Sequence, residues 1–245
     1  MTQGIGLDAD RSSSHPPPTL RLGHELWSLR PVLHNGPGWR VPIWVQGCSI
    51  RCTTVCLNPH FLEAKGGFRY RVDEVAVRIE QLVNQAGVSI EGITVLGGEP
   101  TDQAAPVAWL FRAAKALGLS TMLYSGATLD QLRGRACVDI DQLLAATDLL
   151  IDGPFLPREF DKDLVWRGSR NQRILRISDR YHEDDVERAL LAQGRSFSIV
   201  LSADGRLSVS GLQTRMGARV IERYVRVLPA NSRSDSLPPP KVCHD

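Results

Sequence analysis

Three of the five cysteines of this chain lie within nine residues, in the segment GCSIRCTTVCLNP. They are Cys48, Cys52 and Cys56, and thiolates grouped in this way are typical ligands of a metal ion or an iron–sulfur cluster. If the segment were a single helix, its outer two sulfurs would lie about 12 Å apart, too far for a compact metal site. The spacing therefore predicts a loop that wraps around its ligand.

Three interpretations of this loop are open. A structural zinc site needs four ligands, and His60 could complete the set of three cysteines, although zinc ligands usually come as separated pairs. Three unligated thiols are the second interpretation, but a polar loop with Gly and Thr is a poor place to bury cysteines. The third is a 4Fe-4S cluster held by three thiolates, with one iron left open to a substrate.

A second motif follows about forty residues later, where an apolar run ends in Gly97, Gly98 and Glu99 of the segment GGEP. Glycines let a ligand approach the backbone closely, and a carboxylate accepts hydrogen bonds from an amino group. Alone, this segment could be only a tight turn between a strand and a helix. After a three-cysteine loop at the end of the preceding strand, it favours the cluster.

Short apolar runs alternate with amphipathic ones along the body of the chain. Strands are expected at Val41–Gln46, Ile93–Leu96, Ser120–Tyr124, Asp148–Ile151 and Arg173–Ile177. Helices are expected at Val72–Ala86, Gln103–Leu117, Thr128–Arg133, Asp139–Ala146 and Glu183–Gln193. This alternation is typical of βα units, whose ligand loops lie at the carboxyl ends of the strands. The expected fold class is α/β, an incomplete parallel (βα) barrel with a small C-terminal antiparallel hairpin around Asp204-Gly205.

The composition of the chain argues against two classes of partner, nucleic acids and membranes. The chain has 245 residues, 42% of them hydrophobic, and a net charge of +2. So small a charge does not indicate a nucleic-acid partner, and no apolar run approaches the roughly 20 residues of a membrane helix. Since the first forty residues also lack a secretory signal pattern, we expect a cytoplasmic protein in a reducing environment.

Gly, Ser and Pro are frequent at both ends of the chain, where large apolar residues are few. We therefore expect a disordered N-terminal segment at 1–21 and a disordered tail at 230–245. Between them, the pattern predicts a catalytic core at 22–180 and a C-terminal extension at 181–229 that holds the last helix and the hairpin.

Three further segments carry a family resemblance: HNGPG at 34–38, DLLIDGPF at 148–155 and WRGSRNQRI at 166–174. With the cysteine loop and GGEP, they resemble the radical S-adenosylmethionine (SAM) superfamily, most of all the small activating enzymes such as the anaerobic ribonucleotide-reductase activating proteins. The resemblance covers roughly Asn35 to Ile177. The chain departs from the family in its second cysteine interval, which is one residue longer than the usual Cys-x3-Cys-x2-Cys.

This resemblance implies a radical SAM oxidoreductase with a partial barrel of the radical SAM type and two cofactors, a 4Fe-4S cluster and SAM. Cys48, Cys52 and Cys56 would ligate the cluster. The residues implied around SAM are Val55 and Leu57 at the adenine, Gly97, Gly98 and Glu99 at the methionine part, and Ser125 and Asp152 at the pocket. One electron, from a donor such as flavodoxin or ferredoxin, would cleave SAM to a 5′-deoxyadenosyl radical that abstracts a hydrogen atom.

The substrate implied by the resemblance is a glycyl radical enzyme, such as an anaerobic ribonucleotide reductase. A second hypothesis keeps the chemistry but replaces the protein substrate with a small molecule or peptide, because the cysteine interval and the C-terminal extension are unusual. A third is a non-catalytic interaction module that binds zinc.

Overall fold

The computed structural model describes residues 16–193, 198–201 and 207–210, all within one compact unit, Met1–Leu212. Its strands are β1 (Thr19–Leu22), β2 (Trp39–Val45), β3 (Phe68–Arg71), β4 (Ile90–Gly97), β5 (Ser120–Tyr124), β6 (Leu149–Asp152), β7 (Arg173–Arg176), β8 (Ser198–Leu201) and β9 (Leu207–Ser210). Its α-helices are α1 (Val72–Gln85), α2 (Ala104–Ala116), α3 (Leu129–Gly134), α4 (Val138–Ala145) and α5 (Glu183–Gln193). The 3-10 turns are Leu26–Ser28, Pro59–Phe61, Pro100–Gln103 and Pro157–Glu159.

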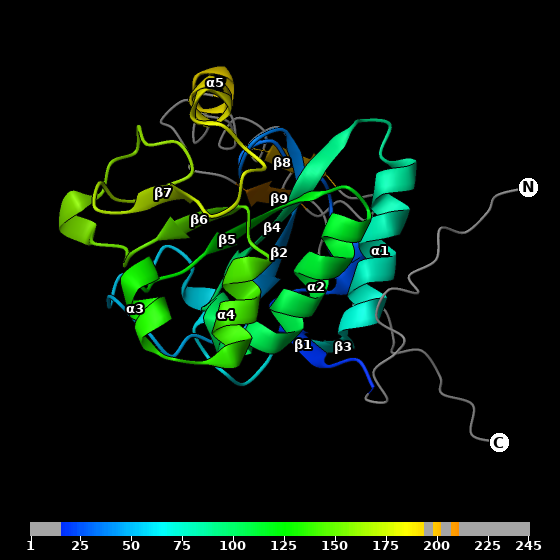
Figure 1. Ribbon diagram of the computed structural model, residues 1–245, viewed down its shortest axis with the longest axis horizontal. Coiled ribbons are helices and arrows are strands. Elements are labelled where there is room, and N and C mark those ends of the chain that lie inside the picture. The colour runs from blue at the N-terminus through cyan, green and yellow to red at the C-terminus, as the bar shows by residue number, and fades with distance from the viewer. Residues whose placement is uncertain (1–15, 194–197, 202–206, 211–245) are drawn as a thin grey trace, which may run out of the picture. The chain divides into compact units, whose positions relative to one another are not determined.

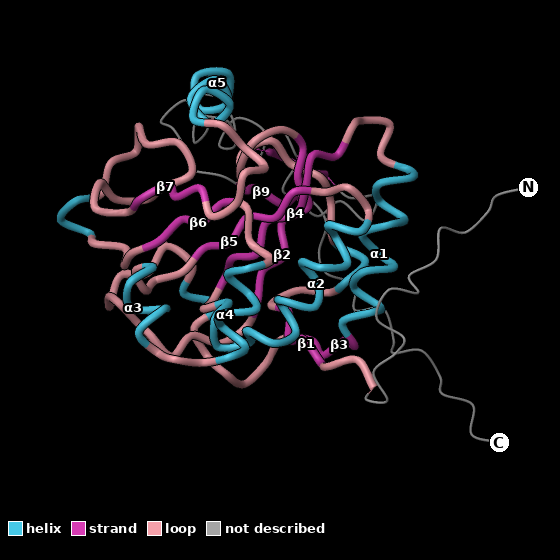
Figure 2. The backbone as a smooth tube through the Cα atoms, viewed as in Figure 1, coloured by secondary structure: helices cyan, strands magenta, loops and turns pink. Residues whose placement is uncertain are grey.

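Four parallel strands, β2, β4, β5 and β6, form the middle of a seven-stranded sheet of order β3-β1-β2-β4-β5-β6-β7. Because their order in the sheet follows their order in the chain, successive right-handed crossovers leave their helices on one face. The helices α1, α2 and α4 lie side by side, each packed on the next (Figures 1 and 2). The loops after the four strands therefore meet at one edge of the sheet.

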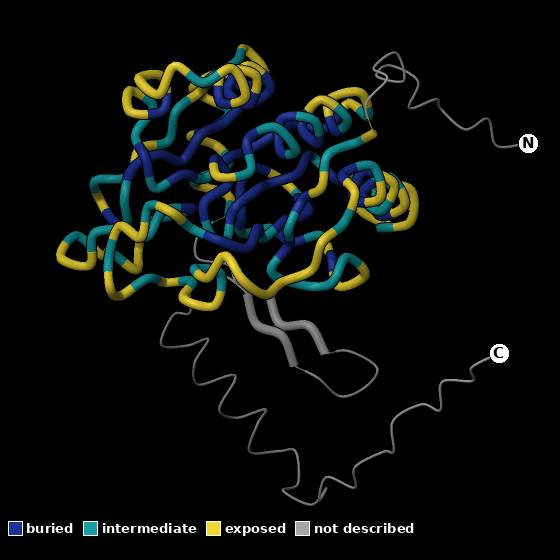
Figure 3. Tube along the Cα trace, turned by 90° about the horizontal axis from the view of Figure 1, so that it is seen from below, coloured by how far each residue is buried: buried dark blue, intermediate teal, exposed yellow. Residues whose placement is uncertain are grey.

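Apolar side chains fill both faces of the sheet. Under the helices, alternate residues of the strands, such as Val41, Ile93 and Val95, are fully buried. On the opposite face, α5 and the segments before it cover the sheet, with a cluster formed by Met122, Leu149, Ile151, Trp166, Tyr181 and Val186. Buried residues accordingly run through the centre of the unit, and exposed ones lie on its outside (Figure 3).

The outer strands are antiparallel, unlike the parallel barrel expected from the sequence. β1 pairs antiparallel with β2 and β3, and β7 pairs antiparallel with β6. A parallel strand needs a crossover, usually a helix, but the described chain between β6 and β7 contains only the short turn Pro157–Glu159. The structure is thus an α/β fold with a mostly parallel, open central sheet.

Each expected strand and helix is present, with bounds that differ by no more than three residues. The hairpin is also present, as the antiparallel pair β8 and β9. β1 and β3 were not expected, and β1 includes the last residues of the segment 1–21. Residues 1–15, 211–229 and the tail 230–245 lie outside the described residues. In the described part of the chain, no helix combines the length and apolar character needed to cross a membrane.

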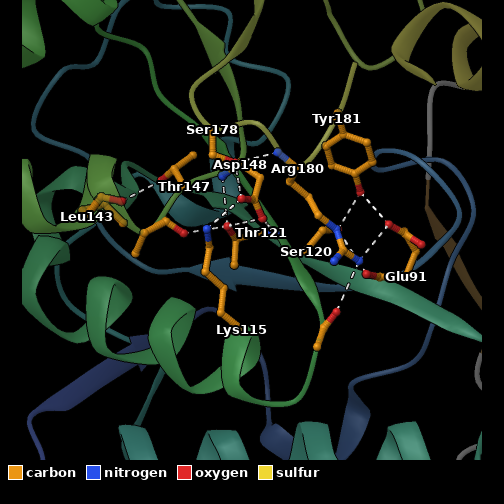
Figure 4. A network of polar contacts seen from close by, with 12 residues as sticks. Glu91, Lys115, Ser120, Thr121, Leu143, Thr147, Asp148, Ser178, Arg180 and Tyr181 are labelled. Carbon is orange, nitrogen blue, oxygen red and sulfur yellow. Dashed lines mark hydrogen bonds and ion pairs between the residues drawn. The ribbon is translucent and has the colours of Figure 1, made fainter. Parts of the chain in front are cut away.

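A polar network at the amino-terminal edge of the parallel strands centres on Asp148, which precedes β6 (Figure 4). Its carboxylate accepts hydrogen bonds from Lys115 Nζ at 2.7 Å, Ser178 Oγ at 2.5 Å and the Thr121 amide at 2.8 Å. Burial by itself would raise the pKa of Asp148, but these donors outweigh it, so the pKa lies below its ordinary value. The carboxylate therefore joins β5, β6 and α2 as long as it stays charged.

We expect the charged Asp148 carboxylate to stabilise the fold near neutral pH and to lose this effect in acid. Because its folded-state pKa is depressed, its contribution is fully present above about pH 5 and is lost as the pH falls through the folded-state pKa. Urea unfolding of the wild type and of Asp148→Asn at a series of pH values tests this. The wild type should be more stable near neutral pH, and the difference should shrink in acid. If the free energies of unfolding of the wild type and of Asp148→Asn differed by the same amount at pH 3 and pH 7, the stabilising role of the Asp148 charge would be contradicted.

Candidate functional site

The cysteine loop leaves the carboxyl end of β2 through Gln46 and Gly47. Gly47 has a φ of 101°, a left-handed conformation that favours glycine. Its amide donates to Phe61 O at 2.9 Å, and the Cys48 amide donates to Leu62 O at 3.1 Å. These bonds close the base of a loop, as the sequence predicted, and Cys48, Cys52 and Cys56 in it form no disulfide.

The glycines of GGEP pack directly against the base of this loop. Gly98 N donates to Val45 O, and Glu99 N donates to Gly47 O, both at 2.8 Å. A Cβ atom at Gly98 would lie 2.0 Å from the Gly47 carbonyl oxygen, so no larger residue fits. The structure thus brings two of the predicted site residues, Gly97 and Gly98, to the cysteine loop, where they allow two backbones to approach closely.

Glu99 is buried, with 1% of its surface exposed, at the start of the turn Pro100–Gln103. Its carboxylate accepts hydrogen bonds from the Thr101 amide and hydroxyl, from Ser125 Oγ at 3.0 Å and from the Gly126 amide at 2.9 Å. Burial raises the pKa of Glu99, and the four donors oppose that shift. Glu99 therefore links the end of β4 to the loop after β5, which holds the predicted residue Ser125.

Asp152 ends β6 and is fully buried at the same edge. Arg173 of β7 donates to it through Nε at 2.9 Å and Nη2 at 2.5 Å, and the Leu129 amide at the start of α3 donates at 2.7 Å. This bidentate pair raises the pKa of Arg173. Asp152 thus holds β7 and α3 in place at the wall of the site.

Val55 and Leu57 lie on the outer part of the cysteine loop and are exposed by 64% and 47%. Leu57 also lies close to Gly168, where an added Cβ would come within 2.8 Å of Leu57 Cδ1 and 3.0 Å of the Phe155 ring. The segment around Gly168 therefore flanks the loop at Leu57, whereas the structure brings Val55 into no contact with the other predicted residues.

Asp102, two residues beyond GGEP, also reaches the cysteine loop. It accepts hydrogen bonds from both the amide and the hydroxyl of Ser49, each at 2.6 Å. Sequence reasoning did not identify it, although an acidic residue just after the glycine turn is a signal that could have pointed to it.

Three thiols in one loop suit iron–sulfur chemistry, whereas a structural zinc site usually takes four ligands. Among the described residues, no three His, Cys, Asp or Glu side chains lie close enough together to hold a metal ion, and His60 is exposed. Backbone amides of Arg51 and Asn58 donate to the sulfurs of Cys48 and Cys56 at 3.5 and 3.3 Å. Hydrogen bonds to cysteine sulfur are among the features that tune iron–sulfur clusters.

A thiol must lose its proton to bind iron. Burial raises the pKa of the Cys48 thiol, whereas the facing amides of Arg51 and Ile50 act in the opposite direction. Cys48 is half-buried and Cys52 is exposed, so the thiols of the loop differ in their surroundings.

Comparison with known proteins points to the same chemistry. Residues 34–175 match the family model described as a 4Fe-4S single cluster domain. The chain is 32% identical over 149 residues to an anaerobic ribonucleoside-triphosphate reductase-activating protein of Vibrio cholerae, covering 59% of this chain and 92% of the relative. The protein of that name in Escherichia coli K12 is 29% identical over 142 residues, covering 56% and 88%. The pyruvate formate-lyase 1-activating enzyme of the same organism is 32% identical over 145 residues, covering 59% and 56%.

Proposed function

Because this chain belongs to the 4Fe-4S single cluster domain family, and within it to the radical SAM activating enzymes, we propose that it activates a glycyl radical enzyme of the anaerobic ribonucleotide reductase type. One observation carries the proposal: a loop of three free thiols is seated on a glycine turn at the carboxyl edge of four parallel strands. The similarity spans 92% of a reductase-activating protein, which supports the same conclusion.

When bound, the cluster supplies the electron that cleaves SAM, and the resulting 5′-deoxyadenosyl radical removes a hydrogen atom from the partner's glycine. In this proposal Cys48, Cys52 and Cys56 ligate the cluster. Gly97, Gly98 and Ser125 line the methionine part of SAM, and Val55 and Leu57 cover its adenine. Glu99 also lines the methionine part and Asp152 faces the pocket, and the protein donors bound to both carboxylates hold them at this edge of the sheet.

The open sheet also suits a large substrate. We propose that β2, β4, β5 and β6 form the core of a radical SAM-type partial barrel within 22–180, whose carboxyl edge the partner approaches. A flavodoxin or ferredoxin in the cytoplasm would supply the electron, because the cluster needs an external one-electron donor.

Electron paramagnetic resonance tests the proposal directly. The chain is reconstituted anaerobically with iron and sulfide, reduced, and mixed with SAM and an anaerobic ribonucleotide reductase. We expect a glycyl-radical doublet that requires SAM and disappears when the partner's radical-bearing glycine is replaced by Ala. Release of 5′-deoxyadenosine without a doublet on any glycyl radical enzyme would contradict it.

A second candidate substrate is a small molecule or peptide. α5, β8 and β9 lie beyond the matched residues 34–175, so these elements are additions to the family core. A modified metabolite or peptide formed without a partner enzyme, found by mass spectrometry of the same reaction mixtures, would favour this candidate.

A further inference from the structure

The first cluster ligand is held by the protein more firmly than the other two. On one side of Cys48, its own amide donates to Leu62 O at 3.1 Å. On the other side, the amide of Ser49 donates to Asp102 Oδ2 at 2.6 Å, and the Ser49 hydroxyl donates to Asp102 Oδ1 at 2.6 Å. The peptide groups on both sides of Cys48 are therefore fixed to other parts of the chain.

The remaining part of the loop lacks such ties. For residues 52–57, the structure gives only local hydrogen bonds, from Val55 N to Thr53 Oγ1 and from Asn58 N to Cys56 Sγ. Cys52 is exposed. Cys48 is thus in place before a cluster arrives, whereas the segment with Cys52 and Cys56 has the freedom to close around it.

Asp102 is itself held by the glycine turn. Its amide donates to Glu99 O at 3.1 Å, and the Glu99 amide donates to Gly47 O at 2.8 Å. The turn Pro100–Gln103 therefore connects the loop after β4 with the cysteine loop after β2, and through Glu99 with Gly126 after β5. The position of the Asp102 carboxylate is therefore fixed by the loops that follow three strands, so Asp102 is well placed to orient a ligand.

Asp102 is exposed, and it carries its charge beside the cysteine loop. In the part of the chain that the structure describes, no Lys or Arg side chain forms a salt bridge with it. A negative charge next to a cluster opposes the addition of an electron and so lowers the reduction potential. A low potential makes the reduced cluster a stronger donor, which suits the cleavage of a sulfonium.

We propose that Asp102 is a positioning residue that presets Cys48 as the first cluster ligand, through Ser49, and that its charge lowers the cluster's reduction potential. This inference rests on the proposed function, because it assumes that the cysteine loop binds a 4Fe-4S cluster. It assigns Asp102 a role in retaining the cluster and setting its potential, but no contact with SAM or substrate.

The test uses reconstituted full-length protein and two readouts, the rate of iron loss to a chelator and the midpoint potential of the cluster. In Asp102→Asn, which keeps the side-chain shape but loses the charge, we expect iron loss to be about 10-fold faster and the potential to rise. In Ser49→Ala, which keeps the charge and the amide bond, iron loss should accelerate while the potential stays near that of the wild type.

A matched control removes one exposed carboxylate elsewhere. Glu183 begins α5, two residues after Tyr181, whose hydroxyl contacts Ser120 at the amino-terminal edge of the sheet. Glu183→Gln should leave both readouts unchanged. In the cluster-free protein, faster amide hydrogen exchange at Ser49 in Asp102→Asn would report the lost anchor independently of iron.

The outcomes separate the two proposals. If the wild type binds no cluster, the proposed function fails. If it binds a cluster, and Asp102→Asn retains iron at the wild-type rate or keeps the wild-type potential, the inference about Asp102 fails while the proposed function stands. If Asp102→Asn does not fold, Asp102→Glu, which keeps the charge on a longer side chain, replaces it. The inference then requires faster iron loss with little change in potential.

Discussion

Replacement of Cys52 by Ala is expected to remove the cluster and abolish SAM cleavage. Cys52 is an exposed free thiol in the middle of the loop, between Cys48 and Cys56. A three-thiolate cluster that loses one ligand is left with two, so iron should fall well below the about four atoms per chain of the wild type. We expect 5′-deoxyadenosine formation to drop by more than about 100-fold, beyond the loss typical of a residue that only supports a ligand.

Cys137 provides the matched control for this experiment. It is also a free thiol, but it lies just before α4, outside the loop. Cys137→Ala should keep its iron, its visible absorption and its activity. Cys48→Ala and Cys56→Ala should behave like Cys52→Ala, and a full complement of iron in any of these three variants would contradict the assignment of the ligands.

The second large effect concerns stability and is expected at Arg40 in β2. This arginine is fully buried on the face of the sheet opposite the helices. Its guanidinium donates to Thr94 Oγ1 at 2.7 Å, to Ile93 O at 2.6 Å and to Ser120 Oγ at 2.8 Å. One side chain thus joins β2 to β4 and β5.

Within the described part of the chain, no carboxylate accepts a hydrogen bond from the Arg40 guanidinium. The Tyr181 hydroxyl lies 3.4 Å from Arg40 Nη1 and donates to Glu91 at 2.8 Å. Burial lowers the pKa of Arg40, and the Tyr181 hydroxyl and the carboxylates of Glu91 and Asp148 act in the opposite direction. The guanidinium therefore binds neutral oxygen atoms, and its removal would take a buried donor from each of them. Thr94 and Ser120 would keep their hydrogen bonds to Asn35 O and Glu91 O.

We expect Arg40→Ala to lower the free energy of unfolding by about 4 kcal/mol, because it leaves a cavity and removes several buried hydrogen bonds that join three strands. Arg40→Lys should lower the free energy of unfolding by less, since an ammonium restores the charge but not the planar guanidinium that joins three strands. Urea unfolding followed by circular dichroism measures both. The control is Arg112→Ala on the exposed surface of α2, which should change stability by no more than about 0.5 kcal/mol. A similarly small loss at Arg40 would show that the network does not hold the sheet.

Much of the fold could be predicted because its strands and helices have strong local patterns. α1 and α2 differ from their expected bounds by no more than one residue at either end, since periodic apolar residues in each are followed by a glycine, Gly87 or Gly118. The antiparallel edges could not be predicted in this way. β1 is four residues long and is held mainly by β3, almost fifty residues away, so nothing near it in the chain indicates a strand.

The features of the site likewise fall into those that could be predicted from the sequence and those that could not. The three-cysteine loop and the glycine turn beside it could be predicted because their chemistry requires particular residue types, and ligation of a cluster by these cysteines stays a prediction. The protein donors around Glu99 and Asp152 could not be predicted, because a carboxylate looks the same in a sequence whatever surrounds it. Only the packing of the strand ends shows that Ser125 and Gly126 donate hydrogen bonds to Glu99, and that Arg173 donates to Asp152.

The sequence by itself determined which chemistry this protein is equipped for: three thiolates in one loop, followed by a glycine turn, in a chain of alternating strands and helices. The tertiary structure alone decided which side chains hold the cysteine loop in place. Asp102 and Ser49 are 53 residues apart and share no motif, yet two hydrogen bonds join them beside Cys48. The reason is physical. Parallel strands bring distant loops to one edge of a sheet, and only there do hydrogen bonds between them form.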